Sequence, residues 1–223
     1  MWFQILVPVL LLPLLAGAEQ PKQTLSSASI SEETREARRS GDHVLTFWWL
    51  PVEYWTASAR ELKKSAKQVD QAHELLQRYV VLAMVDARVY SDGRLAYRNM
   101  EGVRDSLRLT RGSREIPPLS RLDPEVARIL PELAYFLSAG LGVMSGGLRL
   151  VLFPNIDDEG EPIASGSANR RIDARYEPEG DALISLVWHA PLTSVVGPGL
   201  CPRGGEALEA SWAYCPYHGV PVE

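Results

Sequence analysis

The sequence predicts an α+β fold that is mainly β: an antiparallel sheet or sandwich-like domain with two helical segments and a small C-terminal tail. Three observations lead to this prediction. About seven β-rich runs outnumber the helical patterns, several of these runs stand at hairpin spacing, and both cysteines lie at or beyond position 201. Strands at hairpin spacing pair antiparallel, and two helices can cover only one face or one end of the sheet.

Composition narrows the class of protein further. The chain has 223 residues, of which 46% are hydrophobic, and this is enough apolar material for a globular core. Its net charge of −5 argues against a non-specific nucleic-acid binder, which would be basic. A mean hydropathy of −0.10 excludes a polytopic membrane protein. We therefore expect that the protein does not bind nucleic acid. Its expected partner is an unidentified protein or envelope component.

The N-terminus is typical of an export signal. An apolar run over residues 5–15 precedes small residues at 16–18, so residues 1–18 are predicted to be a signal peptide and the protein to be exported, to the periplasm or outside the cell. No Lys or Arg precedes the run. The alternative is therefore an uncleaved membrane anchor over 2–18, which just reaches the length of a span. Residues 19–42 hold almost no large apolar side chain and are predicted to be a flexible linker.

A mainly-β domain is predicted over residues 43–195. It opens with a strand over 43–50, where β-branched and aromatic residues are frequent. A helix over 57–78 follows, because Ser58 and Glu61 form a capping box and apolar residues then recur at helical spacing. The opposite face of this helix is charged, so we expect it to lie on the surface and to cover one side of the sheet.

The rest of this domain is predicted to contain six further strands and one more helix. Gly93 supplies the left-handed position of a tight turn between the first two of these strands. The helix opens with Asp123 as its cap and Pro124 at its first position; Pro131 is expected to kink or split it before Gly140 ends it. The strands are predicted at 79–90, 94–98, 106–110, 147–154, 170–176 and 182–189.

Five aromatic residues gather within nine positions, and they are the first candidate for a ligand site. Along the strand, Trp48 would point to one face and Trp49 to the other, and Trp55 follows shortly after. Exposed on the surface, these rings would bind a carbohydrate or a peptide. The alternative is that they fill the core of the sheet beneath the helix over 57–78.

An acidic segment suggests a calcium loop. Asn155, Asp157 and Glu159 alternate as oxygen donors and Gly160 stands sixth, but Gly166 occupies the twelfth position, where such loops have a bidentate Glu. An acidic hairpin tip explains the same residues without a metal.

The sequence leaves the catalytic residues unknown, because it contains no catalytic pattern. None of the four histidines stands in a His-Glu-x-x-His pattern, and no Gly-x-Ser-x-Gly elbow occurs. Asp86 and His189 lie on predicted strands, but nothing in the sequence requires them to meet.

The tail over 196–223 carries the most specific signal. It contains two Cys-Pro-x-x-Gly units, at 201–205 and at 215–219. Zinc knuckles have this shape because two ligands on a tight turn closed by Gly both point at one tetrahedral ion. The second unit keeps both ligands, whereas the first has Gly204 in place of its second ligand.

This tail resembles the C-terminal zinc-ribbon repeat, Cys-Pro-x-Cys-Gly twice, of uncharacterised bacterial exported proteins that join a β-rich domain to such a ribbon. The family implies no known activity, and the chain departs from its pattern at Gly204. The resemblance extends to the residues that link the two units, namely Glu206, Leu208, Trp212 and Tyr214. It also includes the segment 150–154, which precedes the tail.

Three interpretations of the tail stay open. Cys201 and Cys215 form a disulfide, as two cysteines of an exported protein can. Alternatively, Cys201, Cys215 and His218 bind a structural zinc ion, with a fourth ligand taken from Glu206, Glu209, His189 or water. Finally, the tail folds without a metal and the protein has no cofactor.

The leading functional hypothesis is a non-catalytic exported protein that acts by binding or as an envelope-associated structural domain. A metal-dependent hydrolase is the first alternative, and it requires a cleft that joins His189 or His218 to acidic residues. A carbohydrate or peptide binder that uses the aromatic cluster from Trp48 to Trp55 is the second.

Overall fold

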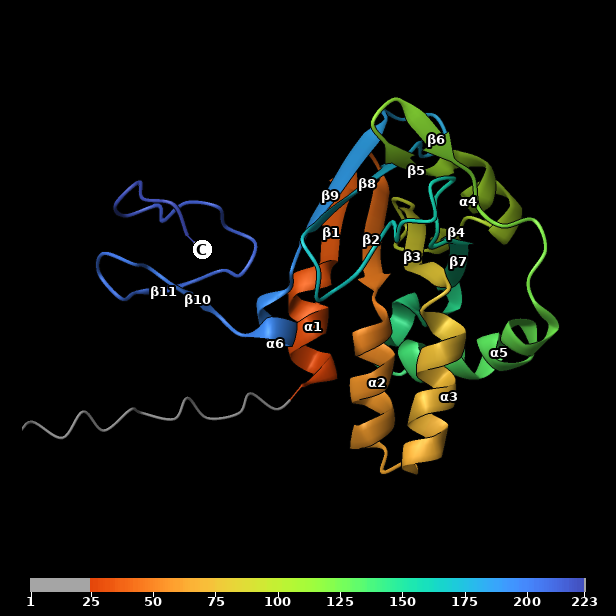
Figure 1. The fold of residues 1–223 in the computed structure, drawn as a ribbon. Coiled ribbons are helices and arrows are strands. Elements are labelled where there is room, and N and C mark those ends of the chain that lie inside the picture. The colour runs from red at the N-terminus through yellow and green to blue at the C-terminus, as the bar shows by residue number, and fades with distance from the viewer. Residues whose placement is uncertain (1–24, 223) are drawn as a thin grey trace, which may run out of the picture.

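Two antiparallel sheets carry the fold in the computed structural model, which describes residues 25–222 (Figure 1). In the first sheet β3 is central, with β2 on one side and with β4 and β7 on the other. Its strands are β1 (Arg35–Ser40), β2 (His43–Leu50), β3 (Tyr79–Val89), β4 (Leu95–Tyr97) and β7 (Arg149–Pro154). The second sheet has the order β6–β5–β8–β9, with β5 (Leu107–Arg111), β6 (Arg114–Ile116), β8 (Arg170–Tyr176) and β9 (Ile184–Ala190).

The two sheets share one apolar core. In β8 and β9 every second side chain is buried, as expected for strands with one packed face. Phe47 of β2 meets Tyr176 of β8 edge-to-face, with ring centroids 5.5 Å apart. Every strand pair in the described residues is antiparallel, so the α+β, mainly β prediction is confirmed.

Helical segments are more numerous than the two that the sequence predicts. Figure 1 shows α1, α2 and α3 side by side at one end of the strands. The helices are α1 (Ser27–Thr34), α2 (Val52–Glu61), α3 (Ala66–Leu76), α4 (Met100–Ser106), α5 (Pro124–Ser138), the 3-10 helix η1 (Gly142–Gly147) and α6 (Thr193–Val196). Among the residues described, no helix is both long and apolar enough to cross a bilayer. The predicted signal peptide, 1–18, lies outside the described residues.

The flexible linker expected over 19–42 is wrong for its described part, since that segment forms α1 and β1. Ile30 of α1 is fully buried, and the indole N–H of Trp188 donates to the Thr34 carbonyl at 2.8 Å. β1 pairs with β2 from Arg35 opposite Trp48 to Ser40 opposite His43. An edge strand is stabilised largely by backbone hydrogen bonds, which a composition of Ser, Glu and Arg does not reveal.

The single helix expected over 57–78 is also wrong, because the chain turns between α2 and α3. Lys63 has a φ of 54°, in the left-handed region, where a helix cannot continue. The capping box is formed by Ser65 and Gln68 at the start of α3, whereas Ser58 is buried inside α2. α5 does begin after its Asp123 cap, but it runs unbroken through Pro131, which lies on its exposed side.

The tail forms a unit of its own beyond α6. It contains the two-stranded sheet of β10 (Gly199–Leu200) and β11 (Ala207–Leu208) and a separate small cluster of buried residues. In Figure 1 this unit lies beside α1 and α6, on the side away from α5. The backbone N–H of Ala210 donates to the Thr193 hydroxyl at 2.9 Å, which ties the tail to α6.

Candidate metal centre

The first tight loop of the tail starts where β10 ends. The backbone N–H of Cys201 donates to the Glu206 carbonyl at 2.9 Å, and the N–H of Gly205 donates to the Cys201 carbonyl at 2.8 Å. Gly205 has a φ of 76°, a conformation that favours glycine. The pairing of β10 with β11 holds the two ends of the loop together.

The second loop repeats this arrangement. Cys215 donates its N–H to the Val220 carbonyl at 2.8 Å, Gly219 donates to the Cys215 carbonyl at 2.8 Å, and Gly219 has a φ of 64°. The two loops therefore match residue for residue. Gly204 in the first loop occupies the position that His218 holds in the second.

Four ligand atoms converge between the loops. The Nδ1 atom of His218 lies 3.3 Å from Cys201 Sγ, 3.6 Å from Cys215 Sγ and 3.7 Å from Glu206 Oε2. All four atoms lie within 4.8 Å of one another, and both cysteines are buried. This Cys–Glu–Cys–His group could hold a metal ion.

Glu206 takes the place of the ligand that the first loop lacks. A Cβ atom on Gly204 would overlap the Glu206 carboxylate, so the side chain of Glu206 fills the space that a residue at 204 would use. Its Oε2 atom is buried and has no hydrogen-bond partner among the described residues. Such an orphaned acceptor beside two thiols and an imidazole is the arrangement that a bound cation would satisfy.

Electrostatics keep this carboxylate ionised. The backbone N–H of Glu206 is the main cause that lowers the pKa of its carboxyl group, and the Cys201 thiol and the nearby His218 lower it as well. The group therefore presents a negatively charged oxygen at neutral pH. Both thiols are free in this structure, so the disulfide between Cys201 and Cys215, one of the three interpretations of the tail, is not present in it.

The other proposed fourth ligands lie elsewhere. His189 is exposed on β9 and Glu209 follows β11, and both line a groove between the tail and α1. The groove joins His189 to acidic residues, as the hydrolase alternative requires. Within residues 25–222, however, the tail group is the only set of three or more His, Cys, Asp or Glu residues that could hold a metal.

The aromatic cluster is part of the core, and a carbohydrate or peptide site on it is wrong. Trp48 is 7% exposed, Trp49 1% and Trp55 4%. Tyr54 packs edge-to-face against Trp48 and Trp55, with centroids 5.2 and 5.1 Å away. The guanidinium of Arg35 covers Trp48 from β1, the strand that composition did not reveal.

The acidic segment around residue 157 is a hairpin tip. Asp157 accepts hydrogen bonds from the backbone N–H groups of Glu159 and Glu161 at 3.0 and 2.8 Å, and Arg111 lies 3.1 Å from its other oxygen. Asp158 pairs with Arg114. These carboxylates are satisfied by arginines and backbone amides, which favours the alternative without calcium.

Asp86 contacts His43 and not His189, the histidine that the sequence also places on a strand. Its carboxylate bonds His43 Nδ1 at 2.6 Å and accepts from the Tyr176 hydroxyl, and all three side chains are buried. His43 stands opposite Arg88, so Asp86 is its diagonal neighbour on the next strand. That register is the signal that sequence reasoning missed.

In comparisons with known proteins, no family model, no curated protein and no solved structure matches the chain.

Proposed function

We propose that this chain is an exported, non-catalytic binding protein whose C-terminal tail is held together by one structural zinc ion. The observation that carries the proposal is the placement of Glu206 in the position left open by Gly204, beside Cys201, Cys215 and His218. The group then has four ligands, the number that structural zinc sites use.

The donor set and its spacing favour zinc over other metals. Two thiolates and an imidazole suit zinc, whereas calcium and magnesium prefer oxygen donors. Around a tetrahedral zinc ion, neighbouring sulfur, nitrogen and oxygen ligands lie roughly 3.3–3.8 Å apart. The three distances from His218 Nδ1, 3.3, 3.6 and 3.7 Å, agree with that geometry.

A structural role follows from the closed ligand set. A catalytic zinc ion keeps one position for water, and here four side chains take all four positions. The tail also buries few apolar residues, so a metal would supply the cross-link that its small core lacks. In an export compartment, zinc would in addition keep the two thiols from oxidising to a disulfide.

The first test is the metal content of the purified protein, measured together with its intact mass. We expect one zinc ion per chain, and after zinc removal a mass that shows both thiols reduced. Substitution with cobalt should produce the thiolate-to-metal absorption of a two-sulfur site. A metal-free protein that is two hydrogens lighter would contradict the proposal and indicate the disulfide.

Matched variants test the individual ligands. His218→Ala should abolish stoichiometric zinc binding, whereas His189→Ala, which lies outside the group, should leave it unchanged. Glu206→Gln should weaken zinc binding by about 10–100-fold, and Glu209→Gln should have no effect. Equal behaviour of the two members of either pair would exclude the ligand set that we propose.

A further inference from the structure

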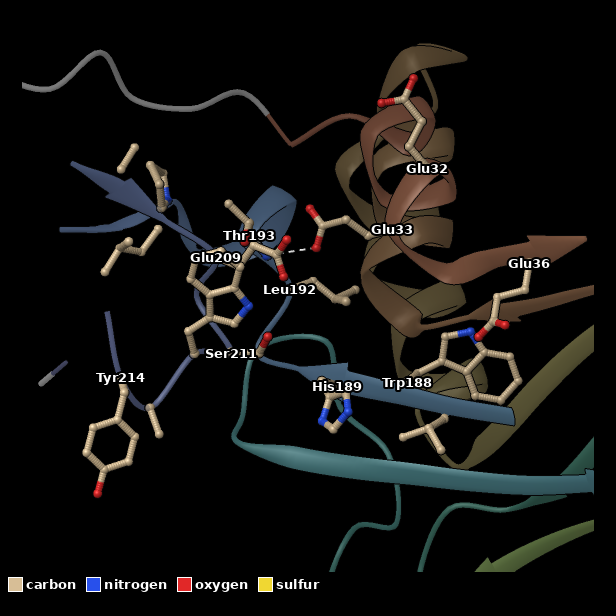
Figure 2. A pocket seen from close by; sticks show the side chains of 16 residues that line it. Glu32, Glu33, Glu36, Trp188, His189, Leu192, Thr193, Glu209, Ser211 and Tyr214 are labelled. Atoms are coloured by element: carbon tan, nitrogen blue, oxygen red, sulfur yellow. Dashed lines mark hydrogen bonds between the residues drawn. The ribbon is translucent and has the colours of Figure 1, made fainter. Parts of the chain in front are cut away.

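A groove of about 970 Å³ separates the tail from the body of the protein (Figure 2). Glu32 and Glu36 lie on one side of it, in α1 and β1, while Glu209 and Tyr214 of the tail lie on the other. Trp188 and His189 of β9 lie between them, and Val187 also lines the groove. None of these residues belongs to the metal-ligand group.

The groove is acidic. Of the residues that the structure describes, four glutamates and no Lys or Arg line it. Glu33 caps α6 by accepting from the backbone N–H groups of Thr193 and Ser194 at 2.9 and 2.6 Å. In the described part of the chain, no side chain forms an ion pair with the carboxylates of Glu32 and Glu209. Glu36 pairs with Arg38, so the uncompensated negative charge of the groove comes from Glu32 and Glu209.

An open sheet edge runs along the same groove. Within residues 25–222, β9 is the last strand of its sheet and pairs only with β8, while β10 and β11 of the tail pair only with each other. Three consecutive residues of β9 line the groove. Successive side chains of a strand point to opposite faces of its sheet, so a groove along a single face would be lined by every second residue. The groove therefore follows the edge of β9. Such an edge presents unpaired backbone N–H and C=O groups.

The tail wall adds aromatic surface to this edge. Tyr214 is 63% exposed, and Trp212 is partly buried against the small core of the tail. A segment that lies along β9 would therefore pass between an aromatic wall and the glutamates of α1 and β1.

We propose that this groove binds an extended, basic peptide segment of a partner protein. The segment adds as a strand to the open edge of β9, its Lys or Arg side chains face Glu32 and Glu209, and its apolar residues contact Trp212 and Tyr214. The inference rests on the proposed function, because the zinc-bound tail supplies one wall of the groove.

The test uses the full protein and a fluorescent peptide of alternating lysine and valine, with a glutamate–valine peptide as its control. We expect the basic peptide to bind, with an affinity that falls as salt rises, and the acidic peptide not to bind. The double variant Glu32→Gln/Glu209→Gln should weaken binding roughly tenfold. A matched double variant of distant exposed glutamates, Glu101→Gln/Glu125→Gln, should bind as the wild type does.

N-methylation of the peptide backbone tests strand addition without altering the protein. Only every second N–H of an added strand faces β9, so methylation of one alternate set should abolish binding and methylation of the other set should not. Equal binding of both methylated peptides would overturn the strand addition, and equal binding of the acidic peptide would overturn the charge recognition.

Zinc content measured on the same samples separates the two proposals. A zinc-loaded protein that fails to bind the basic peptide contradicts the groove alone. Binding by a protein that takes up no zinc contradicts the metal site and leaves the groove in place.

Discussion

The body of the protein, residues 25–195, and its tail, residues 196–222, are stabilised in different ways. The body buries one large apolar cluster to which both sheets contribute. The tail buries only Cys201, Leu208 and Cys215, and two of these three are candidate metal ligands. A unit of this size has too little apolar surface to fold stably without a cross-link. The body should therefore fold without metal, and the tail should depend on it.

The largest expected difference between the two regions is in stability, when a cavity is created in the core of the body. Phe47 is 2% exposed and packs against Tyr176, so Phe47→Ala should lower the free energy of unfolding by about 3–5 kcal/mol. Urea unfolding followed by circular dichroism measures this loss. Under native conditions the zinc affinity of the tail should stay unchanged, and a parallel fall in zinc affinity would show that the two regions are one cooperative unit.

The two regions should also differ, by a smaller amount, in how their stability depends on pH. Burial raises the pKa of Tyr54 to about 12, and burial together with the neighbouring Asp86 raises the pKa of Tyr176 as well. In the unfolded chain a tyrosine hydroxyl has its ordinary pKa of 10.0. The unfolded state therefore releases protons first, and the stability that these groups contribute is complete below pH 10 and is lost as pH rises toward 12.

For the body we expect an alkaline loss of roughly 2–3 kcal/mol from Tyr54 alone, measured as a fall of the unfolding midpoint. Tyr54→Phe should reduce this pH dependence, whereas Tyr135→Phe, at an 81% exposed tyrosine, should not. The tail should respond to acid instead, because thiolate and imidazole ligands take up protons and release the metal. Loss of zinc and unfolding of the body at the same pH would contradict this separation.

The smallest effect concerns the fourth ligand. Gly204→Cys should displace the Glu206 carboxylate and supply a thiolate in its place, which we expect to raise zinc affinity about tenfold, or by about 1.4 kcal/mol. The equivalent residue of the second loop is His218, so a side chain is compatible with this loop position. Competition with a chelator measures the affinity.

A double-mutant comparison makes this test specific. Glu206→Gln should cost affinity in the wild type but not in the Gly204→Cys background, since the carboxylate is then no longer a ligand. An equal cost in both backgrounds would show that Glu206 acts through the fold of the tail and not as a ligand.

The strands of this protein were largely predictable because their signal is local. The alternation of buried and exposed side chains in β8 is present in its own seven residues, and the prediction of 170–176 matches the strand. The Asp123 cap and Pro124 likewise locate the start of α5. By contrast, α1 and β1 are stabilised by distant partners: Trp188 bonds the end of α1, and β2 pairs with β1. Their own composition carries no sign of those contacts.

The same division applies to the candidate sites. The spacing of the two Cys-Pro-x-x-Gly units by itself identified Cys201, Cys215 and His218 as possible ligands, because a knuckle is a local turn. Only the tertiary structure selected Glu206 over Glu209 and His189, since that choice depends on which carboxylate folds back over Gly204. The groove was not predictable at all: it joins α1, β9 and the tail, which are far apart in sequence and come together only through packing.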